Sequence, residues 1–107
     1  MRSDDRLNDI FYALSDSTRR EIVHLLAHGE RTVTELAHPF DISLAAVSKH
    51  VKVLETAGLL QRTIQGRTHY CRLNASTMET ATQWLNLYER YWSVRFDAFE
   101  AKLSEPE

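Results

Sequence analysis

The sequence contains few of the residues that form covalent or metal cross-links. Among its 107 residues there is one cysteine, Cys71, which excludes a disulfide framework within the chain and a metal site built from cysteines. Glycine and proline are also scarce, with three and two residues, and the 43% hydrophobic and 26% charged residues are typical of a globular protein. We therefore expect one folded domain spanning residues 1–107.

Long hydrophobic runs are absent as well. No segment approaches the ~18 apolar residues that a membrane-spanning helix needs, and the charged segment 1–6 (MRSDDR) is unlike a signal peptide. With a lone cysteine, this pattern predicts a cytoplasmic protein without a membrane partner.

The small net charge of −2 hides a gradient along the chain. Residues 31–72 carry six basic and three acidic side chains, whereas residues 1–30 carry four and six, and residues 73–107 carry three and six. The basic centre includes Lys49, Lys52, Arg62, Arg67 and Arg72. A net acidic domain binds DNA when it gathers its cations on one face and turns its carboxylates away, and this distribution is suited to that.

Three helices are predicted in the first forty residues. Apolar residues at helical spacing indicate one helix around 7–14, and a second begins at one of four candidate caps in 15–18 and ends at Gly29. Within 15–18 the choice of N-cap stays open, although Thr18 and Glu21 have the spacing of a capping box. A third helix, capped by Thr32 and Glu35, is expected to last about two turns before Pro39.

The second half predicts a longer helix, a hairpin and a terminal helix. Ser43 is a suitable N-cap and Gly58 a stop for the fourth helix, which would bury Val47, Val51 and Leu54. Residues 60–73 have strand-like composition with a turn at 65–66, and a long helix capped within 76–79 follows. The fold class is therefore mainly α with a β-hairpin wing: a winged helix-turn-helix with five helices and two strands in the order α-α-α-α-β-β-α.

The fourth helix and the hairpin tip carry the candidate DNA-binding residues. Small side chains permit close approach to base edges, hydroxyl and imidazole groups hydrogen-bond bases or phosphates, and cations neutralise phosphates. An arginine on the turn suits a phosphate or a narrow minor groove. The predicted residues are Ser43, Ala45, Ala46, Ser48, Lys49, His50, Lys52, Arg67 and Thr68.

Four segments together resemble the ArsR/SmtB family of bacterial transcriptional regulators, over roughly residues 7–75. They are 13–23 (ALSDSTRREIV), 33–37 (VTELA), 48–60 (SKHVKVLETAGLL) and 66–73 (GRTHYCRL). The resemblance implies a homodimeric repressor that binds double-stranded DNA at an inverted-repeat operator and is released by an inducer. It assigns the recognition helix to Ser48, Lys49 and His50 and the wing tip to Arg67.

The chain departs from the family at its metal sites. Many members sense metals through cysteines at the third helix, where this sequence has Thr32, Thr34 and Ala37, and others use histidines on the last helix, where it has none. Residues 84–97 (WLNLYERYWSVRFD) are similar to a metal-free subgroup, which implies a lipid-like or small organic inducer of unknown identity. We therefore expect no metal and no cofactor.

The last helix is unusually aromatic for a small domain, which indicates that part of it forms a subunit interface. We predict a DNA-binding core at 7–75 and a dimerisation helix at 76–104, with the first helix contributing to the dimer. The predicted interface residues are Leu7, Phe11, Trp84, Tyr88, Tyr91, Trp92, Phe96 and Phe99.

Other functions stay open at this stage. One is a winged-helix module that binds a protein without binding DNA. Another is a sensor with an unfamiliar metal site, for which His24 and His28 have a suitable spacing. The sequence has no phosphate loop, nucleophile motif or convincing carboxylate pair, so we do not expect an enzyme.

Overall fold

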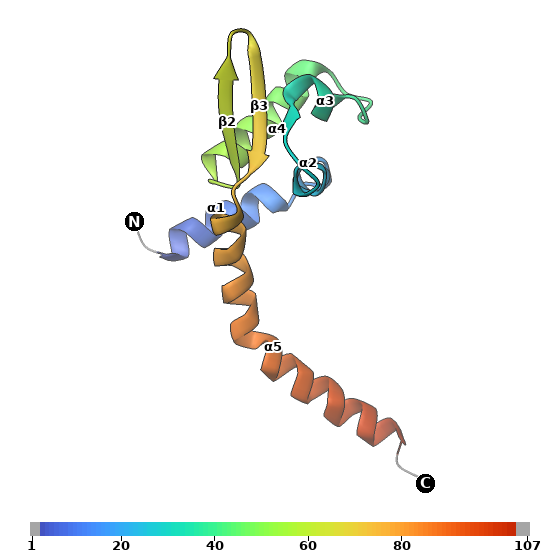
Figure 1. Ribbon diagram of the computed structural model, residues 1–107. Helices are drawn as coiled ribbons and strands as arrows, with labels where there is room; N and C mark the ends of the chain where they lie inside the picture. Colours follow the sequence, from blue (N-terminus) through green and yellow to red (C-terminus); the bar gives the residue numbers. More distant parts are fainter. Residues whose placement is uncertain (1–2, 105–107) are drawn as a thin grey trace.

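The computed structural model describes residues 3–104, and it describes the side chains of residues 5–89, 91, 93–95 and 97–103. Five helices and three short strands form a winged helix-turn-helix (Figure 1), which confirms the predicted fold class. In chain order they are α1 (Ser3–Leu14), α2 (Ser17–Ala27), β1 (Arg31–Thr32), α3 (Val33–Ala37), α4 (Leu44–Thr56), β2 (Leu60–Gln65), β3 (Thr68–Leu73) and α5 (Ala75–Ser104).

Local capping explains where the central helices begin and end. The N-cap of α2 is Asp16, whose carboxylate accepts the backbone N–H of Arg19 at 3.1 Å, so the spacing of Thr18 and Glu21 was not the capping signal. The capping box predicted for α3 is confirmed. This helix has five residues rather than two full turns, because Pro39 cannot donate the backbone hydrogen bond that would extend it.

The helix α4 has the predicted boundaries. The Ser43 hydroxyl accepts the backbone N–H of Ala46 at 3.1 Å and caps the helix. Gly58, just beyond the end of the helix, has a φ of +81°, which side-chain-bearing residues rarely adopt.

The sheet contains one strand more than predicted. Its order is β1-β3-β2, with both pairs antiparallel, so the two-residue strand β1 adds to the outer edge of the hairpin. The hairpin turn is one residue later than predicted: Gln65 pairs with Thr68, which leaves Gly66 and Arg67 as the turn. Gly66 has a φ of +64°, as this tight connection requires.

The hydrophobic core lies where α1, α2, α3, α4 and the base of the wing meet. Its largest fully buried apolar side chains come from all of these elements. They are Ile10, Ile22, Leu36, Val47, Val51, Leu54, Leu59 and Cys71. The core therefore fixes α4 against the rest of the domain while the outer side of α4 stays exposed.

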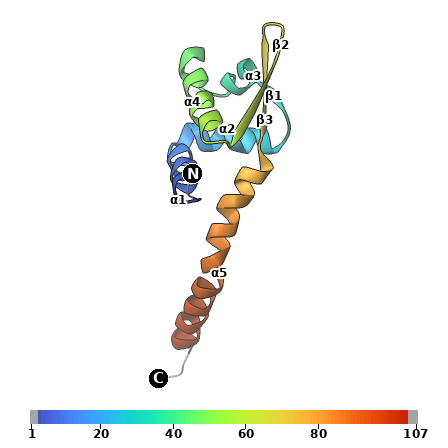
Figure 2. The same ribbon diagram turned by 90° about the vertical axis from the view of Figure 1, so that its left-hand side faces the viewer.

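The helix α5 projects away from the domain, opposite the wing (Figures 1 and 2). Thirty helical residues span about 45 Å, and the molecule measures 68 × 35 × 20 Å. The helix begins at Ala75, one residue before the predicted capping segment, and Thr77 is buried instead of acting as a cap. Its hydroxyl accepts a hydrogen bond from the Arg6 guanidinium at 3.3 Å, which ties α5 to α1.

Candidate nucleic-acid interface

One side of α4 faces solvent along most of its length. Val47, Val51 and Leu54 face the core, as predicted, and Ser43, Ala45, Lys49 and Lys52 are exposed. Ala46 and Ser48 are half-buried between these two sides. The helix thus presents small, hydroxyl and cationic side chains on its outer surface.

A groove of about 280 Å³ runs between the start of α4, the strand-to-helix corner before α3 and the wing. Three predicted residues line it together, namely Ser48 on α4 and Arg67 and Thr68 at the wing. Leu44 and Thr34 line it as well, although neither was among the predicted site residues. The fold therefore brings the start of α4 and the wing together in one groove. We call the outer surface of α4 together with this groove and the wing tip the α4–wing face.

The predicted site residue His50 is placed differently. Its ring is three-quarters buried, with Nδ1 3.1 Å from Nη1 of Arg19 and 3.8 Å from the Asp16 carboxylate. The helical period turns this position toward the start of α2 rather than toward the α4–wing face. His50 therefore contacts its own domain, and local sequence patterns could not predict this because both partners lie more than thirty residues earlier.

Two cations near the base of the wing, Arg62 on β2 and Lys52 on α4, also make contacts within the domain. Arg62 is largely buried, and its guanidinium contacts the Glu55 carboxylate at 3.3 Å and Nδ1 of His69 at 3.1 Å. Lys52 lies 3.9 Å from the same carboxylate but keeps 73% of its side chain exposed. Arg62 is therefore paired with a carboxylate of its own domain although it also lines the groove, whereas Lys52 remains accessible.

Arg72 lies on the other side of the wing. Side chains alternate along a strand, so Arg72 and its cross-strand partner Gln61 point away from the face shared by Arg62 and Cys71. The Arg72 guanidinium donates to Gln61 Oε1 at 3.1 Å. The basic segment identified from sequence is thus divided between two faces, with Lys49 and Arg67 exposed on the α4–wing side.

Arg19 is a functional candidate that the motif analysis did not single out. It is 92% buried, and it donates to the backbone carbonyls of Ala13 at 2.7 Å and Tyr12 at 3.3 Å, at the end of α1. Carbonyls at the end of a helix lack a partner within it. The Tyr12 carbonyl also accepts hydrogen bonds from the backbone N–H and hydroxyl of Ser15, so Arg19 matters most for the Ala13 carbonyl. With its contact to His50, Arg19 joins α1, α2 and α4. In the sequence, the one indication of this role was a long arginine side chain in the segment 17–20 (STRR).

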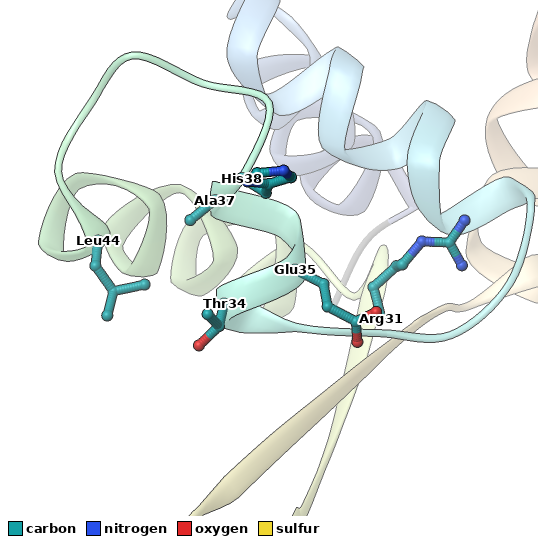
Figure 3. A pocket seen from close by; sticks show the side chains of 6 residues that line it. All are labelled: Arg31, Thr34, Glu35, Ala37, His38 and Leu44. Atoms are coloured by element: carbon teal, nitrogen blue, oxygen red, sulfur yellow. The ribbon is translucent and has the colours of Figure 1, made fainter.

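A second pocket, of about 600 Å³, lies over α3 (Figure 3). Leu44 and Thr34 extend on the same side of the short helix, while Arg31 and Glu35 line the pocket at its beginning, with the Arg31 guanidinium directed away from the Glu35 carboxylate. Hydrogen bonds from Thr32 lower the pKa of Glu35, and the positive charge of Arg31 adds to this. The pocket is therefore open and polar at one end and apolar at Leu44.

The side chains considered for metal or thiol chemistry, His24, His28 and Cys71, lie on or next to α2 and on β3. Among the described residues, no group of three His, Cys, Asp or Glu side chains is placed to hold a metal ion. His24 and His28 contact each other with ring centroids 4.9 Å apart, and no third ligand joins them within the described part of the chain. Burial raises the pKa of the Cys71 thiol, which disfavours the reactive thiolate.

Aromatic residues of α1 and α5 form an exposed apolar surface, which we call the α1–α5 face. The rings of Phe11 and Trp84 lie 5.6 Å apart, those of Trp84 and Tyr88 lie 5.2 Å apart, and Leu7 is adjacent. Farther along α5, Tyr91 and Phe99 are exposed, with Arg95 stacked on Tyr91. The side chains of the other two predicted interface residues, Trp92 and Phe96, lie outside the described residues.

No helix in the described part of the chain is long and apolar enough to cross a membrane. This agrees with the hydropathy pattern of the sequence.

Comparisons with known proteins agree with the architecture. A family model described as a helix-turn-helix domain matches residues 14–63, which contain α2, α3, α4 and the start of the wing. The transcriptional repressor SdpR of Bacillus subtilis is 33% identical over 79 residues, covering 74% of this chain and 88% of that protein.

Solved structures give the same result. A crystal structure of the ArsR family transcriptional regulator RHA00566 is 37% identical with a TM-score of 0.78, covering 84% of this chain and 93% of that one. A homodimeric winged helix-turn-helix DNA-binding domain from Mycobacterium bovis, described as a possible ArsR-family regulator, is 26% identical with a TM-score of 0.65, covering 81% and 82%. The resemblance inferred from the four sequence segments is thereby confirmed, and the chain belongs to the ArsR family of transcriptional regulators.

Proposed function

We propose that the protein is a homodimeric transcriptional repressor that binds an inverted-repeat operator through α4 and the wing. The observation that carries this proposal is the α4–wing face, where Ser48, Arg67 and Thr68 line one groove beside the exposed Lys49. The curated relative SdpR is a repressor and the M. bovis domain is a homodimer that binds DNA, which favours this function over a protein-binding module.

The residues on this face divide into two chemical roles. Lys49, Lys52 and Arg67 are exposed cations that neutralise phosphates and set the register on the duplex. Ala45, Ala46 and Ser48 lie on the side of α4 that enters the major groove, where small side chains permit close contact with base edges. The hydroxyls of Ser43 and Thr68 flank this helix and the wing and donate to phosphate oxygens.

A second copy of this chain is the proposed occupant of the α1–α5 face. Trp84, Tyr88 and Phe99 are 38–63% exposed, a large apolar surface for a protein of this size. The surface continues from α1 onto α5, so two copies related by a two-fold axis bury it together. In this proposal residues 7–75 bind DNA and residues 76–104 form the dimerisation helix, as expected from the sequence.

DNA binding is tested with a fluorescent duplex from the region upstream of the protein's own gene, against a scrambled duplex, at two salt concentrations. We expect tight, selective binding that weakens steeply with salt. Lys49→Ala and Arg67→Ala should each reduce the magnitude of the salt slope by about 2 in a dimer, since each removes one phosphate contact per protomer. Lys102→Ala, an exposed cation near the end of α5, is the matched control. If both variants bind like the parent, the proposed docking is wrong.

The dimer is tested by sedimentation equilibrium. Trp84→Ala removes a half-exposed ring that contacts both Phe11 and Tyr88, so the dimer dissociation constant should rise at least tenfold, as is usual for an aromatic residue at the centre of an interface. Arg20→Ala, which changes an exposed residue on α2, is the control. An unchanged dissociation constant for Trp84→Ala contradicts this interface.

The remaining expectations concern catalysis, cellular location and an inducer. We infer that it acts as a regulator and not as an enzyme, because the family to which it belongs consists of transcriptional regulators. A cytoplasmic location and a small-molecule inducer remain predictions from the sequence.

A further inference from the structure

Leu44 is a large apolar side chain at an unexpected place on the α4–wing face. It is the first residue of α4, directly after the cap Ser43, and it is 53% exposed. It lines the groove shared by Ser48 and Arg67 and also borders the pocket over α3, which Thr34 lines as well (Figure 3). Leu44 thus stands at the junction of the two concave surfaces next to the start of the recognition helix.

The position of Leu44 limits what it can recognise. In a helix-turn-helix the first residues of the recognition helix approach base edges in the major groove. The isobutyl group has no hydrogen-bonding atom, and the apolar group exposed in the major groove is the C5-methyl of thymine. Several polar side chains of the same groove, among them Ser48 and Arg67, can hydrogen-bond the polar atoms of bases and phosphates, which leaves an apolar contact as the favourable one for Leu44.

We propose that Leu44 is a specificity-determining residue that contacts a thymine methyl group in each half-site of the operator. This inference rests on the proposed DNA-binding function. The neighbouring Ala45 and Ala46 end at Cβ, whereas Leu44 reaches farther from the helix, so it makes the larger apolar contact. Operator binding should therefore weaken when the methyl group that contacts Leu44 is missing.

The test compares operator fragments amplified with thymidine or with deoxyuridine triphosphate, which differ by the methyl group at every thymine. For the parent protein we expect weaker binding to the deoxyuridine fragment, by about fourfold for each methyl group that contacts Leu44. Leu44→Ala should lower this thymine-to-uracil affinity ratio by the same factor, whereas Leu44→Met, which stays apolar and of similar size, should retain it. Leu87→Ala, which truncates an exposed leucine on α5, should have the parental ratio.

The outcomes separate this inference from the proposed function. A parent protein that does not bind the upstream fragment selectively refutes the proposed function, and the role of Leu44 with it. A parent that binds selectively but with the same affinity for both fragments, or a ratio unchanged in Leu44→Ala, refutes the role of Leu44 and leaves the repressor proposal standing. Because the side chain is half-exposed, Leu44→Ala should unfold at nearly the parental temperature, which thermal unfolding checks.

Discussion

Replacing Arg19 with alanine should destabilise the fold far more than its place in a run of two arginines suggests. The Arg19 guanidinium is buried and donates to the carbonyls of Ala13 and Tyr12, and it also contacts His50 on α4. Arg20, its neighbour, is exposed and donates to a single carbonyl, that of Leu14, at 2.9 Å. The two residues therefore form a matched pair that differs in burial and in the number of contacts.

The magnitude follows from the hydrogen bonds that are lost. A hydrogen bond from a charged group contributes roughly 1.5–3 kcal/mol when it is buried. Arg19→Ala removes the donor to the buried Ala13 carbonyl, whereas the Tyr12 carbonyl keeps its hydrogen bonds from the backbone N–H and hydroxyl of Ser15. We expect a loss of about 2–4 kcal/mol in the free energy of unfolding, against about 0.5–1 kcal/mol for Arg20→Ala. With a typical urea dependence for a domain of this size, the midpoint for Arg19→Ala falls by roughly 1–2 M.

The assay is urea unfolding followed by circular dichroism, with all variants at one protein concentration because unfolding of a dimer depends on concentration. Arg19→Lys is informative as a third variant, since its ammonium keeps the charge but cannot reproduce the planar fork that reaches two carbonyls and His50. It should recover only part of the stability. Equal losses for Arg19→Ala and Arg20→Ala would refute the reasoning that burial and multiple contacts make Arg19 the stronger link.

Three further predictions test other parts of the fold. Gly58→Ala should lower the free energy of unfolding by about 1–2 kcal/mol, since the φ of this residue is +81° and a Cβ there meets the Thr77 hydroxyl at 3.4 Å. Gly66→Ala, whose Cβ would lie in open space, should lower it less in urea unfolding. The reverse order would contradict the packing of Gly58 against α5. Burial raises the pKa of the Cys71 thiol, so a maleimide at about pH 8 should label it only after denaturation, and rapid labelling of the folded protein would show that the thiol is accessible. The cap bond from a backbone N–H lowers the pKa of Asp16, so its contribution to stability is present above the unfolded value and is lost as the pH falls through the folded one. Asp16→Asn keeps a capping side chain without the titration, and its stability should therefore fall less than that of the parent between about pH 5 and pH 2; parallel acid profiles would contradict this assignment.

Local signals predicted most of the fold correctly. The caps at Thr32 and Ser43 and the stop at Gly58 depend on residues within one turn of the chain, so the sequence alone contains the information. The strand β1 was missed because two residues show no periodicity, and they become a strand only by pairing with β3. The turn shift has the same origin, since the pairing of Gln65 with Thr68 fixes the register.

Site residues could be predicted from the sequence only where the ~3.6-residue period of a helix determines whether a side chain is exposed. The exposed positions of Lys49 and Ala45 follow from the burial of Val47 on the same helix. The internal contacts of His50 and Arg62 depend on residues that the fold brings together from other elements, and a count of charges along the chain treats such groups as free.

These contacts explain how a protein with a net charge of −2 can present a basic face. Glu55, near the end of α4, is the carboxylate that would repel a phosphate from the base of the wing, and Arg62 and Lys52 flank it at 3.3 and 3.9 Å. Arg62 is thereby paired inside the fold, and its charge with that of Lys52 offsets the negative charge of Glu55. As a result, the α4–wing face carries fewer unpaired positive charges than a count along the sequence suggests. In the proposed function, Lys49, Lys52 and Arg67 supply the exposed cations of this face. We therefore expect selectivity to depend largely on close apolar and hydroxyl contacts at the start of α4, because few phosphate contacts are available to raise affinity for every sequence equally.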